Sequence, residues 1–268
     1  MAKKMFTTHV IVFCITLIAA LPLSQAQSIT AEKVLTEIKE LLEPEETMVR
    51  DIHVNIKFQN DTTMEWEACE IRKTIDDEKK ILIMIREPEP LYGFTILIRE
   101  PLKQRAINTW VYAPSLNRIR RINNIFTYEP FLGTDFTYTD IGFIDPWADH
   151  ELMPDHDEKK EDIVVLKSIP RSSAYYSKII TFVSADNFMP VKRYYYDIGG
   201  DLWKTLVFSD AKMDPDGNVI SFTMEMFDHF EKTSTEWVAK RSEVKDDISN
   251  AYFTPEKLPE VKNAPFCR

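Results

Sequence analysis

Hydrophobic and polar positions near the start of the chain follow the repeat of one amphipathic helix. Between residues 34 and 42 apolar side chains recur three and four positions apart, which places them on one helical face. Ser28 or Thr30 can cap the start of this helix, and Pro44 is suited to end it. The apolar positions are Val34, Leu35, Ile38, Leu41 and Leu42. The pattern predicts a helix that buries this one face.

From residue 49 the pattern changes to short segments rich in β-branched and aromatic residues. Turn signals such as Asp76-Asp77 and Gly199-Gly200 separate them, and links this short join antiparallel neighbours. The expected strands span residues 49–58, 63–74, 79–86, 93–99, 106–113, 118–122, 162–169, 177–184, 190–197, 202–213, 219–230 and 232–244. Because a long meander of this kind curls into a barrel or part-barrel, we predict a mainly β protein.

Residues 123–161 form the one long stretch without a strand pattern, which predicts a functional loop or a short helix. His150 and His156 stand there among the acidic residues of positions 149–157. Imidazole and carboxylate groups at close spacing can ligate a divalent ion. The spacing matches no specific metal template, so we favour a solvated acidic loop without metal.

Acidic residues in the strand at 63–74 raise the question of catalysis. Glu65, Glu67 and Glu70 can be read as catalytic carboxylates. Glu65 and Glu67 share one face of the strand while Trp66 points to the other, so charge on an outer face explains them better. The sequence carries no nucleophile elbow, phosphate-binding glycine loop, zincin helix or dinucleotide fingerprint. We therefore expect a protein that is not an enzyme and that has neither cofactor nor metal.

The N-terminus has the three parts of a cleaved secretory signal. Lys3 and Lys4 precede an apolar run from residue 10 to 20, Pro22 breaks that run, and residues 24–26 read SQA. An uncleaved membrane anchor is the alternative, but the run is shorter than the ~20 residues that a spanning helix needs. We predict a signal peptide at residues 1–26, removed on export to the periplasm, and one mature domain at residues 27–268.

The mature chain is strongly acidic. Removing Lys3 and Lys4 from the 33 basic residues leaves 31 against 43 acidic ones, a net charge of −12. Such a charge argues against nucleic acid and against electrostatic binding to anionic membrane surfaces. Cys69 and Cys267 are the two cysteines after residue 26, and an oxidising compartment would allow them to pair. The sequence gives no distance between them, so the disulfide stays open.

Aromatic residues are spread over many strands, and segments such as 80–85 are apolar on both faces. The interior of a curled sheet of about 11 strands is wider than side chains readily fill, and methionines would give it an adaptable lining. An ordinary core is the alternative interpretation. The candidate residues for a cavity that holds acyl chains are Trp66, Ile83, Met84, Leu97, Trp110, Tyr112, Phe136, Tyr138, Trp203 and Met224.

Several motifs in a fixed order resemble one family. Residues 108–114 read NTWVYAP, 117–122 read NRIRRI and 131–141 read FLGTDFTYTDI. Residues 176–178 (YSK), 189–192 (MPVK) and 250–258 (NAYFTPEKL) continue the likeness towards the C-terminus. This combination resembles the outer-membrane lipoprotein-sorting proteins of the LolA/LolB-like fold. The motif residues that carry it best are Pro114, Arg120, Arg121, Gly133, Asp135 and Asp140.

The resemblance implies an incomplete antiparallel β-barrel, mainly β with some α, plugged by the N-terminal helix and short loop helices. It implies a monomeric periplasmic carrier that binds lipid or lipoprotein acyl chains in a hydrophobic cavity, touches membranes transiently and moves its cargo between the inner and outer membranes. Arg120 and Arg121 are suited to face an exporter or a cargo headgroup, or alternatively to pair with Asp135 and Asp140 and brace the long loop.

A second function class stays open beside the carrier. This branch of the family looks similar to proteins that accompany inner-membrane exporters of the resistance-nodulation-division (RND) type, which implies an accessory module without cargo of its own. A carrier needs an apolar cavity, whereas an accessory module can have a filled interior. The identity of the cargo, whether lipoprotein, phospholipid, hopanoid or sterol, is left open by the sequence.

Overall fold

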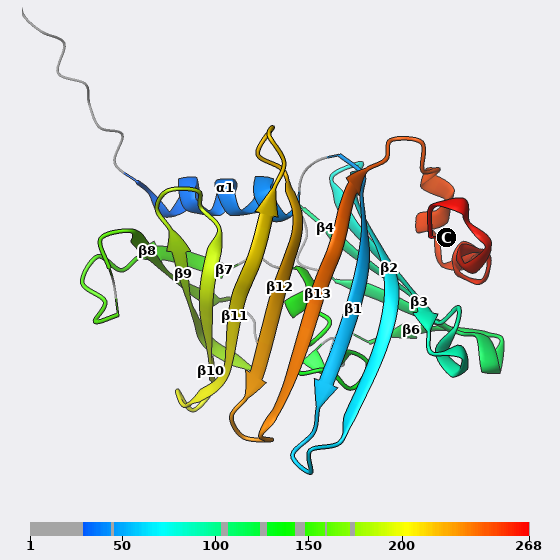
Figure 1. Ribbon diagram of the computed structural model, residues 1–268, viewed down its shortest axis with the longest axis horizontal. Coiled ribbons are helices and arrows are strands. Elements are labelled where there is room, and N and C mark those ends of the chain that lie inside the picture. Colours follow the sequence, from blue (N-terminus) through cyan, green and yellow to red (C-terminus); the bar gives the residue numbers. More distant parts are fainter. Residues whose placement is uncertain are drawn as a thin grey trace, which may run out of the picture.

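One antiparallel sheet of 13 strands carries the structure (Figure 1). The computed structural model describes residues 29–43, 46–102, 107–123, 128–142, 148–158, 160–171 and 175–267. The strands are β1 (Met48–Lys57), β2 (Thr63–Ile75), β3 (Glu78–Glu87), β4 (Thr95–Pro101), β5 (Asn108–Ala113), β6 (Arg118–Ile122), β7 (Ala148–Leu152), β8 (Ile163–Pro170), β9 (Tyr176–Ser184), β10 (Pro190–Asp197), β11 (Leu202–Met213), β12 (Val219–Asp228) and β13 (Thr233–Val244).

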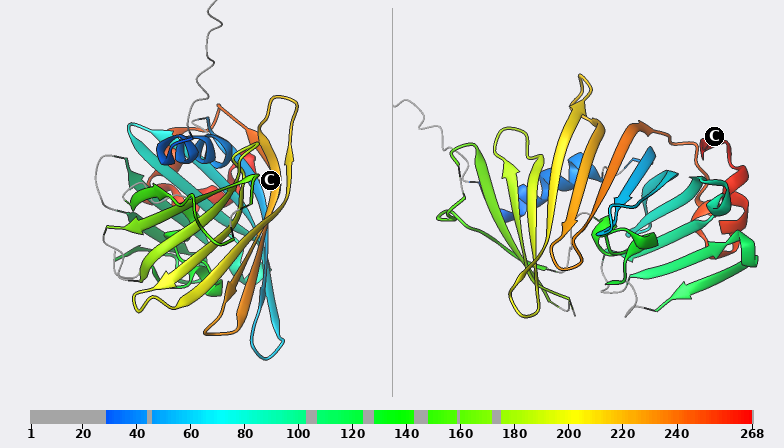
Figure 2. Two further views of the ribbon diagram at one scale, coloured as in Figure 1. Left: turned by 90° about the vertical axis from the view of Figure 1, so that its left-hand side faces the viewer. Right: turned by 60° about the horizontal axis from the view of Figure 1, so that its bottom comes forward.

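The strand order shows two meanders joined at the middle of the sheet. It runs β6-β5-β4-β3-β2-β1-β13-β12-β11-β10-β9-β8-β7, so the first and the last strand of the chain are neighbours. Met48 of β1 pairs with Val244 of β13, and Lys57 pairs with Ser234. Within the described residues β6 and β7 each pair with one strand, so the sheet curves but does not close (Figure 2). The prediction of an incomplete antiparallel barrel is confirmed.

The number of strands exceeds the prediction of about 11. The twelve segments expected from the sequence all contain strands, and the additional strand β7 lies inside the stretch predicted as a loop. Its sequence ADHEL has no run of β-branched or aromatic residues. Pairing with β8 forms it, from Ala148 opposite Pro170 to Leu152 opposite Leu166. Tertiary pairing has therefore overridden a weak local pattern.

The predicted helix is α1, Ala31–Leu42, and its start is capped as expected. The backbone N–H of Lys33 donates to Oγ1 of Thr30 at 3.2 Å, which satisfies one of the amide groups left open at a helix start. Val34, Ile38 and Leu42 are fully buried, in agreement with the helical spacing. They belong to the same hydrophobic cluster as the apolar residues of the central strands, so α1 packs with this face on the sheet (Figure 2).

Short 3-10 helices account for much of the remaining described chain. Three of them follow β13 and pack on the face of β2–β5 opposite to α1, where Phe253, Leu258 and Val261 are fully buried. The sulfur atoms of Cys69 in β2 and Cys267 are joined in a disulfide that fixes the end of this cover. The 3-10 helices are Glu89–Leu91, Pro114–Leu116, Phe131–Gly133, Asp140–Gly142, Asn250–Phe253, Pro255–Asn263 and Pro265–Cys267.

The predicted signal at residues 1–26 lies outside the described residues. In the described part of the chain, none of the helices combines the length and the apolar composition that crossing a membrane would require.

Removing the disulfide tests how strongly it holds the C-terminal cover. The two cysteines are 198 residues apart, so the cross-link restricts a very long loop of the unfolded chain. In the chain-entropy model this contributes about 5 kcal/mol to the free energy of unfolding. We expect Cys69→Ser/Cys267→Ser to unfold at clearly lower urea concentration and to lose residues 250–267 first under limited proteolysis. Equal urea midpoints and equal cleavage patterns would contradict this role.

Candidate functional site

The concave face of the sheet is a continuous apolar surface. Side chains alternate between the two faces of a strand, so the inner residues of each central strand lie two positions apart, and most of them are apolar. Because α1 and residues 128–142 belong to the same cluster, this face is the inner one (Figure 2). Its buried members on the sheet include Ile52, Val54, Ile56, Trp66, Ala68, Ile81, Ile83, Ile85, Ile96, Ile98, Phe222, Met224, Met226, Trp237 and Ala239.

An irregular segment, residues 128–142, packs on this surface. The ring of Phe131 lies 6.0 Å from both Trp66 and Trp237, measured between ring centroids, and Phe136 lies 5.6 Å from Trp237. Trp66 and Trp237 meet edge to face at 5.5 Å. Tilted and edge-to-face aromatic pairs at such distances are favourable. In this structure side chains therefore occupy the inner face between β2 and β13.

Asp135 fixes the middle of the segment to β13. Its carboxylate accepts hydrogen bonds from Oγ1 of Thr235 at 2.6 Å and from Oγ1 of Thr233. The buried ammonium group of Lys204 in β11 donates to the main-chain oxygen of Asp135 at 2.7 Å. Burial raises the pKa of Asp135, against the lowering effect of the two threonine hydroxyls. The segment is thus held by polar contacts to two strands as well as by its aromatic rings.

A network of buried charges lies where α1 ends, and Glu70 of β2 is its centre. Both Arg50 and Arg72 pair with this carboxylate, at 3.3 and 2.8 Å, and all three residues are at most 3 % exposed. Burial alone would raise the pKa of Glu70, but the two guanidinium groups hold it below the ordinary value. Burial lowers the pKa of Arg50 to about 10, against the raising effect of Glu70.

The network continues through Lys79 in β3. Its ammonium group pairs with Glu43 at 3.1 Å and with Glu100 at 2.8 Å, and Arg72 also reaches Glu43 at 2.8 Å. Burial alone would lower the pKa of Lys79, but Glu43 and Glu100 hold it above the ordinary value. Three positive and three negative groups therefore balance one another inside the protein, as buried charges require.

The basic side chains of this network also donate hydrogen bonds to main-chain oxygens of α1 and of residues 128–142. Arg50 donates to the carbonyl of Leu42 at the end of α1, at 2.5 Å. Arg72 donates to the carbonyl of Ile141 at 2.7 Å, and Lys79 donates to that of Gly142 at 3.1 Å. One network thus fixes the end of the helix and the end of the irregular segment.

A series of aromatic rings leads from the inner cluster to the surface. Tyr128 stacks on Tyr175 with centroids 5.0 Å apart, and Tyr175 lies 6.3 Å from Trp203. Trp203 in turn stacks on Phe230, again at 6.3 Å. Phe230 is 53 % exposed at the turn between β12 and β13, whereas Tyr175 and Trp203 pack against the inner cluster. The series gives apolar contact from the solvent to the inner face.

The predicted cavity residues divide between the two faces of the sheet. The inner cluster contains Trp66, Ile83, Phe136, Tyr138, Trp203 and Met224. The opposite face, under the C-terminal cover, contains Met84, Leu97, Trp110 and Tyr112. The two sets lie on opposite faces and cannot line one cavity. The sequence pattern showed that both faces of β3 and β4 need cover, but not which face is concave.

Comparison with known proteins places the chain in a family. A family model described as "-like: Uncharacterized protein" matches residues 77–260. The chain belongs to this family. None of the curated proteins matches this chain.

Solved structures show that the chain has a LolA-like fold. A lipoprotein-sorting protein domain from Vibrio parahaemolyticus is 24% identical, with a TM-score of 0.77 over 85% of this chain and 99% of that one. A DUF1329 family protein from Desulfovibrio piger is 20% identical, with a TM-score of 0.76 over 85% and 97%. A LolA superfamily protein from Nitrosomonas europaea is 19% identical, with a TM-score of 0.66 over 85% and 98%. The resemblance inferred from the motifs is confirmed at the level of the fold.

The LolA-like motif residues have mostly structural surroundings here. Gly133 has φ +79°, a conformation that favours glycine, and Asp140 accepts hydrogen bonds from the N–H of Thr137 and from the hydroxyl of Tyr176. Pro114 begins a 3-10 helix. Arg120 and Arg121 are exposed on β6. Of the two alternatives for these arginines, pairing with Asp135 and Asp140 is therefore wrong, because hydroxyl groups of Thr233, Thr235 and Tyr176 bind these two carboxylates.

The two histidines of the acidic stretch lie apart from each other. Nδ1 of His150 is 2.8 Å from Oγ of Ser168 between β7 and β8, whereas the ring of His156 packs edge to face on Phe182. Among the described residues no group of three or more His, Cys, Asp or Glu side chains is arranged to hold a metal ion. Glu67 pairs with Lys240 at 2.8 Å across the outer face of the sheet.

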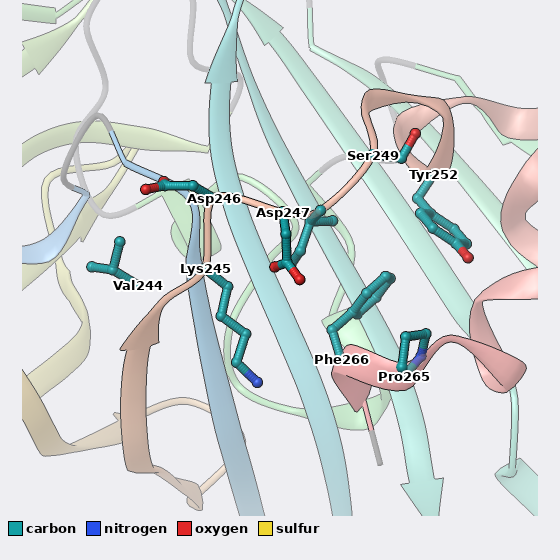
Figure 3. A pocket seen from close by; sticks show the side chains of 9 residues that line it. Val244, Lys245, Asp246, Asp247, Ser249, Tyr252, Pro265 and Phe266 are labelled. Carbon is teal, nitrogen blue, oxygen red and sulfur yellow. The ribbon is translucent and has the colours of Figure 1, made fainter.

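A pocket of about 730 Å³ lies outside the sheet, between the end of β13 and the C-terminal cover (Figure 3). Lys245, Asp246 and Asp247 supply charged groups to its wall, and Tyr252 and Phe266 supply aromatic ones. It is separated from the inner face by the sheet itself. A charged wall on the outer face does not suit acyl chains, so the inner face is the better candidate site.

Replacing Glu70 tests the buried network. Glu70→Gln leaves Arg50 and Arg72 without this carboxylate, so we expect a loss of about 3 kcal/mol in the free energy of unfolding at pH 7. Because the pKa of Glu70 is lowered in the folded state, its contribution is present above the ordinary glutamate pKa and is lost as pH falls through the lowered value. The deficit of the variant should therefore shrink in acid.

Urea unfolding at several pH values measures this difference. Glu65→Gln is the matched control on the same strand, since the Glu65 side chain is 71% exposed, and it should change the free energy of unfolding by less than about 0.5 kcal/mol. Two variants of equal stability at pH 7 would show that the network does not stabilise the fold.

Proposed function

We propose that this protein is a periplasmic carrier that binds lipid or lipoprotein acyl chains on the concave face of its sheet. The observation that carries the proposal is the continuous apolar surface on that face, covered by α1 and by residues 128–142 rather than by another sheet. The LolA-like fold supports it, since it is shared with a domain from Vibrio parahaemolyticus that is described as lipoprotein-sorting. In this proposal residues 1–26 direct export and are removed, and residues 27–268 form the carrier domain.

Loading requires that the inner elements give way, because α1 and residues 128–142 cover the inner face in this structure. Withdrawing Val34, Ile38 and Leu42 of α1 from the sheet would cost roughly 5–9 kcal/mol, at about 1.5–3 kcal/mol for each side chain. Burying a saturated chain of about 15 methylene groups would yield ~12 kcal/mol. A single acyl chain can therefore offset the displacement of the helix, and a cargo with several chains does so with a margin.

The buried charge network determines which part of the helix moves. The C-terminal end of α1 is bound through Leu42 and Glu43, both in contact with the network. At the other end the ammonium group of Lys33 lies 5.6 Å from the ring centroid of Phe188, a weak contact at the turn between β9 and β10. We infer that α1 swings about its C-terminal end.

A second candidate function is an accessory module of an inner-membrane exporter of the RND type, without cargo of its own. The packing of Phe131 and Phe136 on Trp66 and Trp237 at the inner face favours it, because such a module needs no cavity. The two functions differ in one measurable property, since only the carrier takes up an acyl chain.

Uptake of a dansyl-labelled fatty acid by the mature protein tests the carrier function. We expect saturable fluorescence enhancement with about one site per chain. Ile38→Ala weakens the packing of α1 by an amount in the range of about 2–5 kcal/mol, so loading should be at least about tenfold faster if displacement of the helix limits the rate. The measurement is stopped-flow fluorescence.

Thr36→Ala is the matched control, because Thr36 lies on the exposed side of the same helix. It should leave the loading rate unchanged. Uptake at the same rate in both variants would show that α1 is not the gate. Absence of any uptake in the unaltered protein would reject the carrier and favour the accessory module.

A further inference from the structure

The edge strand β6 carries a concentration of positive charge in an acidic protein. Its five residues read RIRRI, and Arg118, Arg120 and Arg121 are all exposed. Within the described residues β6 pairs only with β5, so its second edge presents main-chain N–H and C=O groups for pairing. The whole chain has a net charge of −10. A basic, unpaired edge in such a protein is a feature that the proposed carrier function does not require.

The arginines project to both faces of the strand. Arg120 stands opposite Val111 of β5, which packs against the inner cluster, and Arg118 is on the same face two residues away. Arg121 stands opposite Trp110 on the other face, where its guanidinium lies 5.7 Å from the indole centroid and donates to Oδ1 of Asn108. Arg121 is thus held by its own chain. Arg118 and Arg120 make no ion pair with any described residue.

The opposite edge of the sheet shows how this protein neutralises edge charges elsewhere. β7 carries two exposed acids, and each has a basic partner in the chain. Asp149 accepts from Arg171, and Glu151 accepts from Lys167 at 2.7 Å. Charges on an edge strand deter unwanted pairing, and β7 achieves this with balanced ion pairs. On β6, Arg118 and Arg120 have no such partner among the described residues, so they can form ion pairs with an acidic group of another molecule.

We propose that β6 binds an extended acidic segment of a partner protein by adding it as a further strand to the sheet. The free edge supplies main-chain hydrogen bonds, as in other cases of strand addition. Arg118 and Arg120 lie two residues apart on one face, so they would bind carboxylates at alternate positions of the added strand. The partner is therefore recognised by acidic residues at every second position.

An acidic peptide fits this edge better than an anionic membrane does. Within the described residues the outer edge of β6 has unpaired main-chain groups, and an extended peptide can hydrogen-bond to them as an added strand, whereas a lipid surface cannot. A second copy of this chain would have to offer β7, whose acids are already paired with Lys167 and Arg171.

Binding of a designed peptide to the full mature protein tests the proposal. The probe is a fluorescein-labelled ten-residue peptide of alternating Glu and Val, measured by fluorescence polarisation at low salt. We expect Arg118→Glu/Arg120→Glu to weaken binding about tenfold or more, and Arg118→Gln/Arg120→Gln to weaken it by a smaller factor. The matched control, Lys212→Glu/Lys232→Glu, makes the same change of net charge at two exposed positions away from β6 and should bind within about twofold of the unaltered protein.

Two further probes separate strand addition from other kinds of binding. A peptide with the same side chains but N-methylated backbone amides should bind much more weakly, and equal binding of the two peptides would overturn strand addition. Flotation with phosphatidylglycerol vesicles that depends on Arg118 and Arg120, without peptide binding, would replace the proposal by a lipid surface. Self-association that is lost in Arg118→Glu/Arg120→Glu, without peptide binding, would replace it by a second copy of the chain.

Discussion

The pairing of β1 with β13 is the constraint on which the rest of the structure depends. It joins the first and last strands side by side, so that two meanders become one sheet whose edges, β6 and β7, come from the middle of the chain. The segment between those edges includes residues 128–142, which pack on the inner face with Phe131 and Phe136 buried. The topology therefore makes the connection between the meanders part of the interior. The strand order and the inner cover are both consequences of the pairing of β1 with β13.

The cover of the inner face combines an apolar surface with a polar anchor. Apolar contacts of α1 and residues 128–142 have little directional preference, so they can be exchanged for other apolar groups such as acyl chains. The buried ion pairs around Glu70 and Lys79 are directional and costly to break. They bind the ends of both elements at one place. This division suits an interior in which the apolar contacts are replaced while the anchor stays intact.

The sequence predicted the elements of the fold well because their patterns are local. The spacing of Val34, Ile38 and Leu42 and the cap at Thr30 are short-range features, and so are the hairpin turns. β7 was missed because its residues have little strand preference and depend on β8 for pairing. The disulfide could not be settled, because Cys69 and Cys267 meet only after the C-terminal segment has folded across the sheet.

The candidate site was predicted less completely, for a different physical reason. Alternation shows that Ile83 and Met84 lie on opposite faces of a strand, but the direction of curvature of the sheet decides which face is inner. The buried network had one signal in the sequence, since Glu70 and Arg72 share the face of Trp66 and Ala68. Charged residues in phase with an apolar face indicate buried ion pairs. Their partners Glu43 and Glu100 come from distant parts of the chain and could not be inferred.

Mass spectrometry of an organic extract tests the central claim most directly. The protein would be purified from its native cells without detergent, extracted, and compared with an equal amount of an unrelated protein purified in the same way. The account predicts a defined lipid or acylated peptide at close to one molecule per chain. An extract without such a molecule, from protein that also fails to take up an acyl probe, would contradict the account.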